Sequence, residues 1–262
     1  MTPAYAVQDS ITMLRRNLRH LQRYPGLSMF PILMPVVFLL LFQFVFGGTL
    51  GNGITLGGGR DAYINFVTPG MLLFAVAGAA QITAISVAKD MADGIITRFK
   101  TMRIWRPAVL TGHVLGSLLL NVIALAVTIA LALLIGFSSP ASPLRWLGAI
   151  AMLMLLAVAL TWLSVAFGLF AKSVETASNI PMFLTLLPFL GSGFVPVGSM
   201  PAGLRWFAQN QPFTPVTNAV RSLLAGHHVG SAATIGIVWC LAITAASYLW
   251  ARHLYDRRPA AR

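Results

Sequence analysis

The chain has 262 residues, of which 57% are hydrophobic and 9% are charged, and its formal net charge is +12. Soluble domains carry about 25% charged residues, so this composition excludes an ordinary soluble domain. The basic charge does not indicate nucleic-acid binding, because 14 of the 18 Lys and Arg residues fall on one side of the predicted membrane, and this asymmetry sets the orientation of membrane proteins. We expect that side, with both termini, to be cytoplasmic and to contact anionic lipids of the cell membrane.

The first 27 residues predict an amphipathic helix that lies along the membrane. Apolar residues recur every three or four positions with arginines between them: Val7, Ile11, Leu14, Leu18 and Leu21, and Arg15, Arg16, Arg19 and Arg23. A helix with a basic polar face lies at the membrane interface. Packing against soluble protein is the alternative.

Six stretches without Asp, Glu, Lys or Arg each contain an apolar run long enough to cross about 30 Å of hydrocarbon as a helix. The predicted spans are 28–46, 63–88, 109–135, 146–171, 177–195 and 232–251. Residues 47–59 are rich in glycine and predict a flexible outer loop. The sequence therefore predicts an all-α polytopic membrane protein with six transmembrane helices in one domain, residues 1–262.

Ionisable groups are missing from the predicted spans. We place all six acidic residues in loops or tails: Asp9, Asp61, Asp90, Asp93, Glu175 and Asp256. We expect His113 to be interfacial and Cys240 to be a packing residue. The sequence contains no nucleotide-binding G-x-x-x-x-G-K-[ST] motif and no paired acids for a metal. It predicts a protein that is not an enzyme and holds no cofactor or metal, so any work must come from another subunit.

Residues 89–108, on the basic side, predict a short amphipathic helix between two spans. Asp93 can cap a helix that begins at Gly94. Ile95, Phe99 and Met102 then share one face, and Thr97, Lys100 and Arg103 share another. Such a helix can rest on lipid or can bind a cytoplasmic partner, and the residues alone favour neither.

Residues 198–230, on the outer side, are too long for a plain turn. They predict two short helices, one capped by Ser199 and one beginning at Thr214-Pro215 and ending at Gly226. We expect a re-entrant or interfacial hairpin that dips into the outer leaflet, with Arg205 and Arg221 near the headgroups. A folded extracellular cap is the alternative.

Two motifs carry a family resemblance. Residues 89–100 read KDMADGIITRFK and are followed by Arg106-Pro107, and residues 210–221 read NQPFTPVTNAVR, with Gln211 inserted between Asn210 and Pro212. With the order of the elements, these motifs make the chain similar to the membrane permease of type-2 ABC exporters, in particular the daunorubicin-resistance-like branch that moves drugs and lipids.

The resemblance implies an elbow helix in residues 1–27, a coupling helix in residues 89–108 and an outer hairpin in residues 198–230. It also implies a homodimer of permeases and two separate ATPase subunits, which bind ATP and Mg²⁺ and drive the export of an amphiphilic drug, lipid or glycolipid. The residues implied to contact the ATPase are Asp93, Gly94, Ile95, Arg98, Phe99, Met102, Arg103 and Arg106.

The same resemblance implies a substrate path beside the first, second and fifth spans. The polar or aromatic residues that we expect to line it are Gln43, Gln81, Thr83, Phe183, Thr185, Phe189 and Phe194. Two other functions remain open at this point: a channel or facilitator that does not use ATP, and a membrane assembly factor. An apolar path suits drugs and lipids alike, so the sequence leaves the substrate open.

Overall fold

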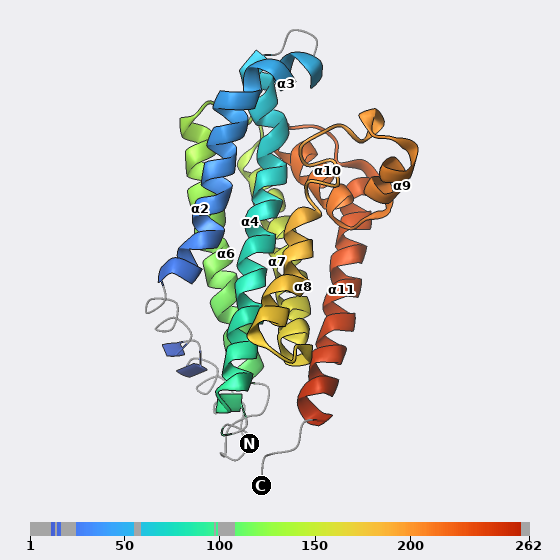
Figure 1. The fold of residues 1–262 in the computed structure, drawn as a ribbon. Coiled ribbons are helices and arrows are strands. Elements are labelled where there is room, and N and C mark those ends of the chain that lie inside the picture. Colours follow the sequence, from blue (N-terminus) through green and yellow to red (C-terminus); the bar gives the residue numbers. More distant parts are fainter. Residues whose placement is uncertain are drawn as a thin grey trace.

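A computed structural model of the chain describes residues 12–13, 15–16, 25–54, 59–96, 98 and 108–257. These residues form helices and turns, and none of them lies in a strand. Figure 1 shows the long helices running side by side, with α9 and α10 beside the upper part of the bundle. Five of the helices in the described part are long and apolar enough to cross a membrane.

The elements follow one another in the order seen in Figure 1. They are α2 (Pro25–Leu41), the π-helix η1 (Phe42–Phe46), α3 (Gly47–Ile54), α4 (Gly59–Ala92), α6 (Ala108–Leu134), α7 (Pro143–Phe170), α8 (Val174–Leu186), the 3-10 helix η2 (Val197–Ser199), α9 (Ala202–Asn210), α10 (Phe213–Leu224) and α11 (Gly230–Arg257). The ends of α4 and α11 and the starts of α2 and α8 lie at the lower end of the bundle in Figure 1, which we call the inner end.

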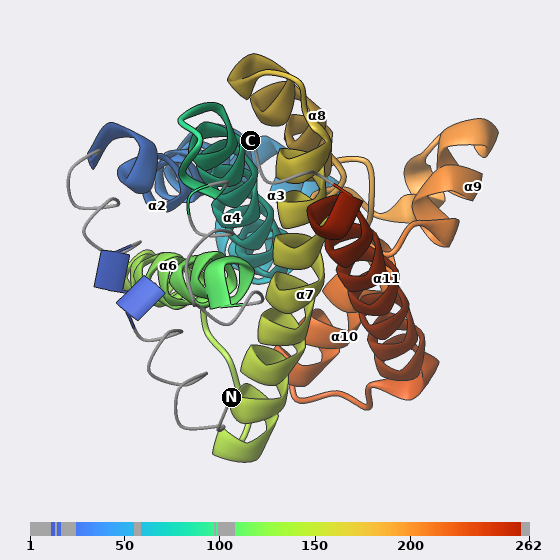
Figure 2. The same cartoon turned by 90° about the horizontal axis from the view of Figure 1, so that it is seen from below.

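Helix α4 is the centre of the bundle. In its most apolar stretch 78% of the residues are buried, against 22% for Met29–Thr49 and 17% for α11. Viewed from below, α2, α6, α7 and α8 lie around it, and α11 packs on the far side of α7 (Figure 2). The outer faces of α2 and α11 are therefore left for lipid or for another protein chain.

Small residues allow α4 and α7 to approach closely. A Cβ atom added to Gly168 of α7 would lie 2.7 Å from the Ala84 carbonyl oxygen and 2.8 Å from Cβ of Val87, both on α4. Helices in a membrane gain no hydrophobic free energy by leaving lipid for each other, so close backbone contact between small residues is a main source of their association.

The glycine-rich segment after the first predicted span is not simply a loop. Residues 47–54 form α3, and residues 55–58 lie outside the described part. The glycines permit close contact between α3 and the start of α4, because a Cβ at Gly51 would overlap the Gly59 carbonyl and one at Gly47 would lie 3.2 Å from the Arg60 side chain.

The predicted fifth span, 177–195, is only partly helical. Helix α8 has 13 residues and ends at Leu186, so it is about 20 Å long, and turns follow it. Pro188 has no N–H to continue the helix, and Gly191 and Gly193 are poor helix formers. The six-span count therefore rests on α8 and the turns after it.

The two predicted outer helices exist, but their caps are wrong. Helix α9 begins after Pro201, and the Ser199 hydroxyl donates to the Pro196 carbonyl at 2.8 Å instead of capping it. Helix α10 begins at Phe213, with Pro212 before it. Its end is confirmed: Gly226 has φ +74, and the His227 N–H donates to the Ser222 carbonyl at 2.9 Å.

Candidate transport site

A cavity of about 460 Å³ opens between α2, α4 and α8. Its walls are apolar, and none of the twelve residues that line it is charged: Phe30, Pro31, Met34, Pro35, Phe38, Phe74, Gly78, Gln81, Met182, Thr185, Leu186 and Phe189. Phe30 is 48% exposed and Met182 is 51% exposed. Since both lie on its wall, the cavity reaches the side of the bundle.

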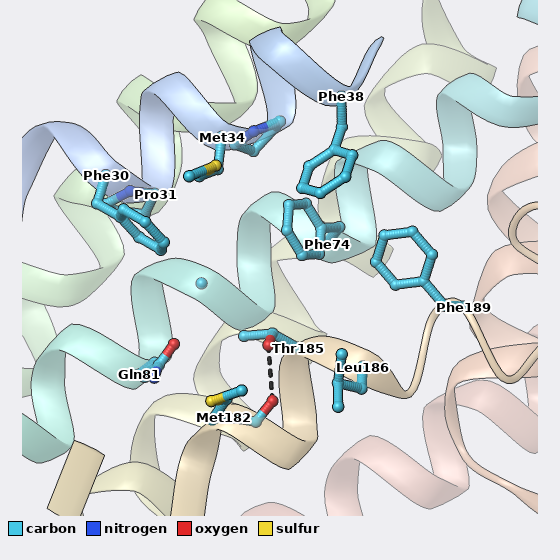
Figure 3. A pocket seen from close by; sticks show the side chains of 12 residues that line it. Phe30, Pro31, Met34, Phe38, Phe74, Gln81, Met182, Thr185, Leu186 and Phe189 are labelled. Atoms are coloured by element: carbon cyan, nitrogen blue, oxygen red, sulfur yellow. Dashed lines mark hydrogen bonds between the residues drawn. The ribbon is translucent and has the colours of Figure 1, made fainter. Parts of the chain in front are cut away.

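Two polar side chains line this cavity. The Thr185 hydroxyl donates to the Met182 carbonyl of its own helix at 2.6 Å. The Gln81 amide nitrogen donates to the Ser178 carbonyl of α8 at 3.0 Å, and Figure 3 shows its oxygen on the cavity side. The Gln81 side-chain oxygen is therefore an oriented hydrogen-bond acceptor in an apolar cavity, and such a cavity suits an uncharged or amphiphilic molecule.

Aromatic rings close the end of the cavity away from the inner end. Phe38, Phe74 and Phe189 converge there with ring centroids 5.4 to 5.9 Å apart (Figure 3). Phe189 also stacks on Phe194, with centroids 4.2 Å apart, and Phe194 stacks on Phe42 at 5.2 Å. Five rings from α2, η1, α4 and the turns after α8 thus form one cluster above the cavity.

The structure brings together three of the seven residues predicted to line a substrate path. Gln81, Thr185 and Phe189 line the cavity. Phe194 stacks on Phe189, and Phe183 is 70% exposed on α8. Gln43 and Thr83 are buried outside the cavity lining, and the Gln43 amide nitrogen faces the Ile135 carbonyl at 3.4 Å. Whether these residues contact a substrate stays a prediction.

Arg221 extends into the protein, and its predicted position near the headgroups stays a prediction. Its Nη2 donates to the Ser192 carbonyl at 2.6 Å and to the Phe66 carbonyl at 3.1 Å. Its Nη1 donates to Asn218 Oδ1 at 3.2 Å, and the guanidinium carbon lies 4.0 Å from the centre of the Phe66 ring. Arg221 therefore joins α10 to α4 and to the turns after α8.

The predicted coupling helix is described only at its start. Gly94 has φ +68 and its N–H bonds the Met91 carbonyl at 3.1 Å, so it ends α4, and the next helical residue is Ile95. The helix thus begins one residue later than predicted. Asp93 and Arg98 are exposed, whereas Phe99, Met102, Arg103 and Arg106 lie outside the described residues.

A buried polar cluster at the inner end was not predicted from the sequence. Asp90 was predicted in a loop, but it lies in α4, is 4% exposed, and contacts Arg16 and His113. His113 was predicted to be interfacial and is also 4% exposed. The order of the spans could have indicated the pair. Asp90 follows the second predicted span and His113 lies near the start of the third, and the short connection between the two spans brings the end of one close to the start of the other.

A bundle of long apolar helices with an uncharged cavity at its side is the architecture of a multi-pass membrane protein. The ABC-2 type transporter family matches residues 8–225, and the chain belongs to this family. It is therefore a permease subunit of an ABC transporter and not itself the ATPase, and the family implies association with an ABC ATPase subunit.

Similar proteins agree with the family. Over 239 residues the chain is 30% identical to the daunorubicin resistance ABC transporter permease protein DrrB1 of Streptomyces coeruleorubidus, covering 91% of this chain and 82% of that protein. It is 20% identical to the probable doxorubicin resistance ABC transporter permease protein DrrC of Mycobacterium tuberculosis, covering 81% and 75%. It is 29% identical to ABC transporter G family member 20 of Dictyostelium discoideum, covering 64% of this chain but 23% of that protein.

Proposed function

We propose that this chain is the permease of an ATP-driven exporter that moves an amphiphilic drug, lipid or glycolipid out of the cytoplasm or the inner leaflet. The observation that carries the proposal is the uncharged cavity between α2, α4 and α8, which reaches the side of the bundle, where lipid lies. A molecule already dissolved in the membrane could enter there without leaving an apolar environment. The drug-resistance names of DrrB1 and DrrC support the choice of cargo.

In this proposal two copies of the chain pair in the cell membrane, with both termini cytoplasmic, and two ATPase subunits bind beneath them. ATP and Mg²⁺ are held by those subunits. The segment from Asp93 to Arg106 contacts the ATPase, and Asp93 and Arg98 are exposed for that contact. Helix α8 and the turns after it complete a sixth crossing, and α9 with α10 forms the outer re-entrant hairpin. The position of α10 beside α4, α7 and α11 supports that hairpin.

The first prediction concerns the energy source. Inside-out vesicles that contain the chain and its ATPase should accumulate daunorubicin only when ATP is hydrolysed. Arg98→Glu should lower uptake several-fold while the chain remains inserted, because it reverses an exposed charge at the proposed ATPase contact. Uptake is measured by the fluorescence of the drug, and a labelled lipid tests the second class of cargo.

A matched variant on the same side is Arg252→Glu, an exposed residue at the end of α11, and it should transport normally. Uptake that does not depend on ATP would favour the facilitator instead. Normal uptake by Arg98→Glu would place the ATPase contact elsewhere.

The second prediction tests the cavity. Gln81→Leu should raise the substrate concentration needed for half-maximal stimulation of ATP hydrolysis roughly fivefold, because a hydrogen bond contributes about 1 kcal/mol. The control is Thr83→Val, which removes a hydroxyl two residues away on α4 outside the cavity lining. Equal effects of the two variants would show that Gln81 does not contact the substrate.

A further inference from the structure

Three polar side chains from three separate elements meet at the inner end of the bundle. The two terminal nitrogens of Arg16 donate to the two carboxylate oxygens of Asp90, each at 2.7 Å. Nε2 of His113, at the start of α6, lies 3.1 Å from Asp90 Oδ2. The Asp90 and His113 side chains are 6% and 3% exposed, and that of Arg16 is 32% exposed. A two-point contact between guanidinium and carboxylate fixes both distance and orientation.

A second contact holds the same N-terminal segment against α6. A Cβ atom added to Gly112 would lie 2.5 Å from Cβ of Met13, so the two backbones approach closely there. Met13 is 6% exposed. Met13 and Arg16 are three residues apart and share one helical face. This face packs on protein, next to His113, and the position of the segment along the membrane stays a prediction.

The cluster lies beside the start of the predicted coupling helix. Asp90 is two residues before the end of α4, and Gly94 turns the chain there. Ile96 is 2% exposed and belongs to the same apolar cluster as Val87 of α4 and Val109 of α6. The beginning of the coupling helix, the inner ends of α4 and α6, and the N-terminal segment are therefore packed together.

The N-terminal segment also leads to the cavity. It precedes α2, which begins at Pro25, and α2 forms one wall of the cavity while α4 forms another. The contact between Arg16 and Asp90 therefore holds this segment to α4, which itself forms a wall of the cavity. Without that contact, a movement of the coupling helix could displace α4 and leave the N-terminal segment behind.

We propose that Arg16, Asp90 and His113 are positioning residues that couple the ATPase to the cavity. They make the N-terminal segment, α4 and α6 move as one body with the start of the coupling helix, so that a push on this helix changes the cavity. The inference rests on the proposed function, because it assumes that an ATPase supplies the push. The cluster sets how many ATP molecules are hydrolysed for each molecule moved, and it does not set the rate of hydrolysis itself.

The test compares hydrolysis with transport in the purified complex of permease and ATPase. Asp90→Asn and Arg16→Lys should lower transport at least tenfold, with ATP hydrolysis within twofold of the wild type. Arg16→Lys keeps the charge and loses the two-point contact, so it separates geometry from charge. The double variant Arg16→Gln with Asp90→Asn should transport better than Asp90→Asn alone, because no unpaired charge is left. Arg15→Gln, at the exposed neighbouring arginine, should behave as the wild type.

A distance measurement tests the same idea without transport. Spin labels at Thr12→Cys and at Ala92→Cys, an exposed residue at the end of α4, in a Cys240→Ala background, should give one narrow distance that is the same with and without ATP. The distribution should broaden in Asp90→Asn. If ATP drives no transport in the wild type, the proposed function fails. The distance measurement still tests whether Arg16, Asp90 and His113 hold the N-terminal segment to α4. Unchanged transport in Asp90→Asn, an equal loss of transport and hydrolysis, or an unchanged distance distribution would overturn the inference.

Discussion

Arg221→Met should lower the stability of the folded chain by about 3 kcal/mol, since a hydrogen bond to a charged group contributes about 1.5–3 kcal/mol and this guanidinium serves several acceptors. The Ser192 carbonyl would lose its 2.6 Å donor, and the Phe66 ring would lose the cation above it. Helix α10 and the turns after α8 should then separate from α4, and transport should fall to background. Thermal unfolding in detergent, followed by transport in vesicles, measures both effects.

Arg205→Met is the matched control for this change. Arg205 also donates to backbone carbonyls, those of Gly198 at 2.7 Å and Met200 at 2.9 Å, but both lie within its own short segment and the residue is exposed. Its loss should cost less than about 1 kcal/mol, as is usual for a surface site. Equal losses of stability in the two variants would contradict the bridging role of Arg221.

Gly168→Ala should destabilise the bundle by about 1–3 kcal/mol, which is the usual effect of overpacking a core. The added methyl group would meet the backbone carbonyl of Ala84 at 2.7 Å. A backbone atom cannot rotate away as a flexible side chain can, so α4 and α7 must separate. The expected result is a lower unfolding temperature and faster exchange of the amide hydrogens of α4.

The same helix offers a control for this prediction. A Cβ atom at Gly148 of α7 would lie 3.5 Å from the end of the Leu223 side chain, an ordinary contact. Gly148→Ala should therefore leave stability unchanged or raise it slightly, because alanine favours a helix. If both variants unfold at the wild-type temperature, the packing of α4 on α7 is looser than described.

The long helices could be predicted from the sequence because an uncharged apolar run of this length has few alternatives to a membrane helix. Their ends could not be predicted in the same way. A charge-free stretch ends at the first charged residue, but a helix continues as long as its backbone hydrogen bonds do. Helix α4 thus extends to Ala92, past Lys89 and Asp90. Asp90 was therefore assigned to a loop because it follows a charged residue, although it lies in α4.

The contacts that hold the two ends of the bundle join residues far apart in the chain. Arg16 and Asp90 are separated by 74 positions, and Arg221 and Phe66 by 155. Periodicity reports which residues share a face of one helix, and it carries no information about which helix lies opposite. Gln81 and Thr185 could be named as polar residues in apolar spans, but their position on one cavity depends on how α4 and α8 pack.

The short α8 determines whether the number of crossings is odd or even. If only the five long apolar helices crossed the membrane, the start of α2 and the end of α11 would lie on opposite sides of it. Figure 1 instead shows the start of α2 and the end of α11 at the same end of the bundle, because α8 and the turns after it lead away from that end once more. If α8 and these turns cross the membrane, as we propose, a reporter fused after α11 should report the same compartment as one fused before α2, whereas a count of only the five long helices would place the end of α11 on the opposite side.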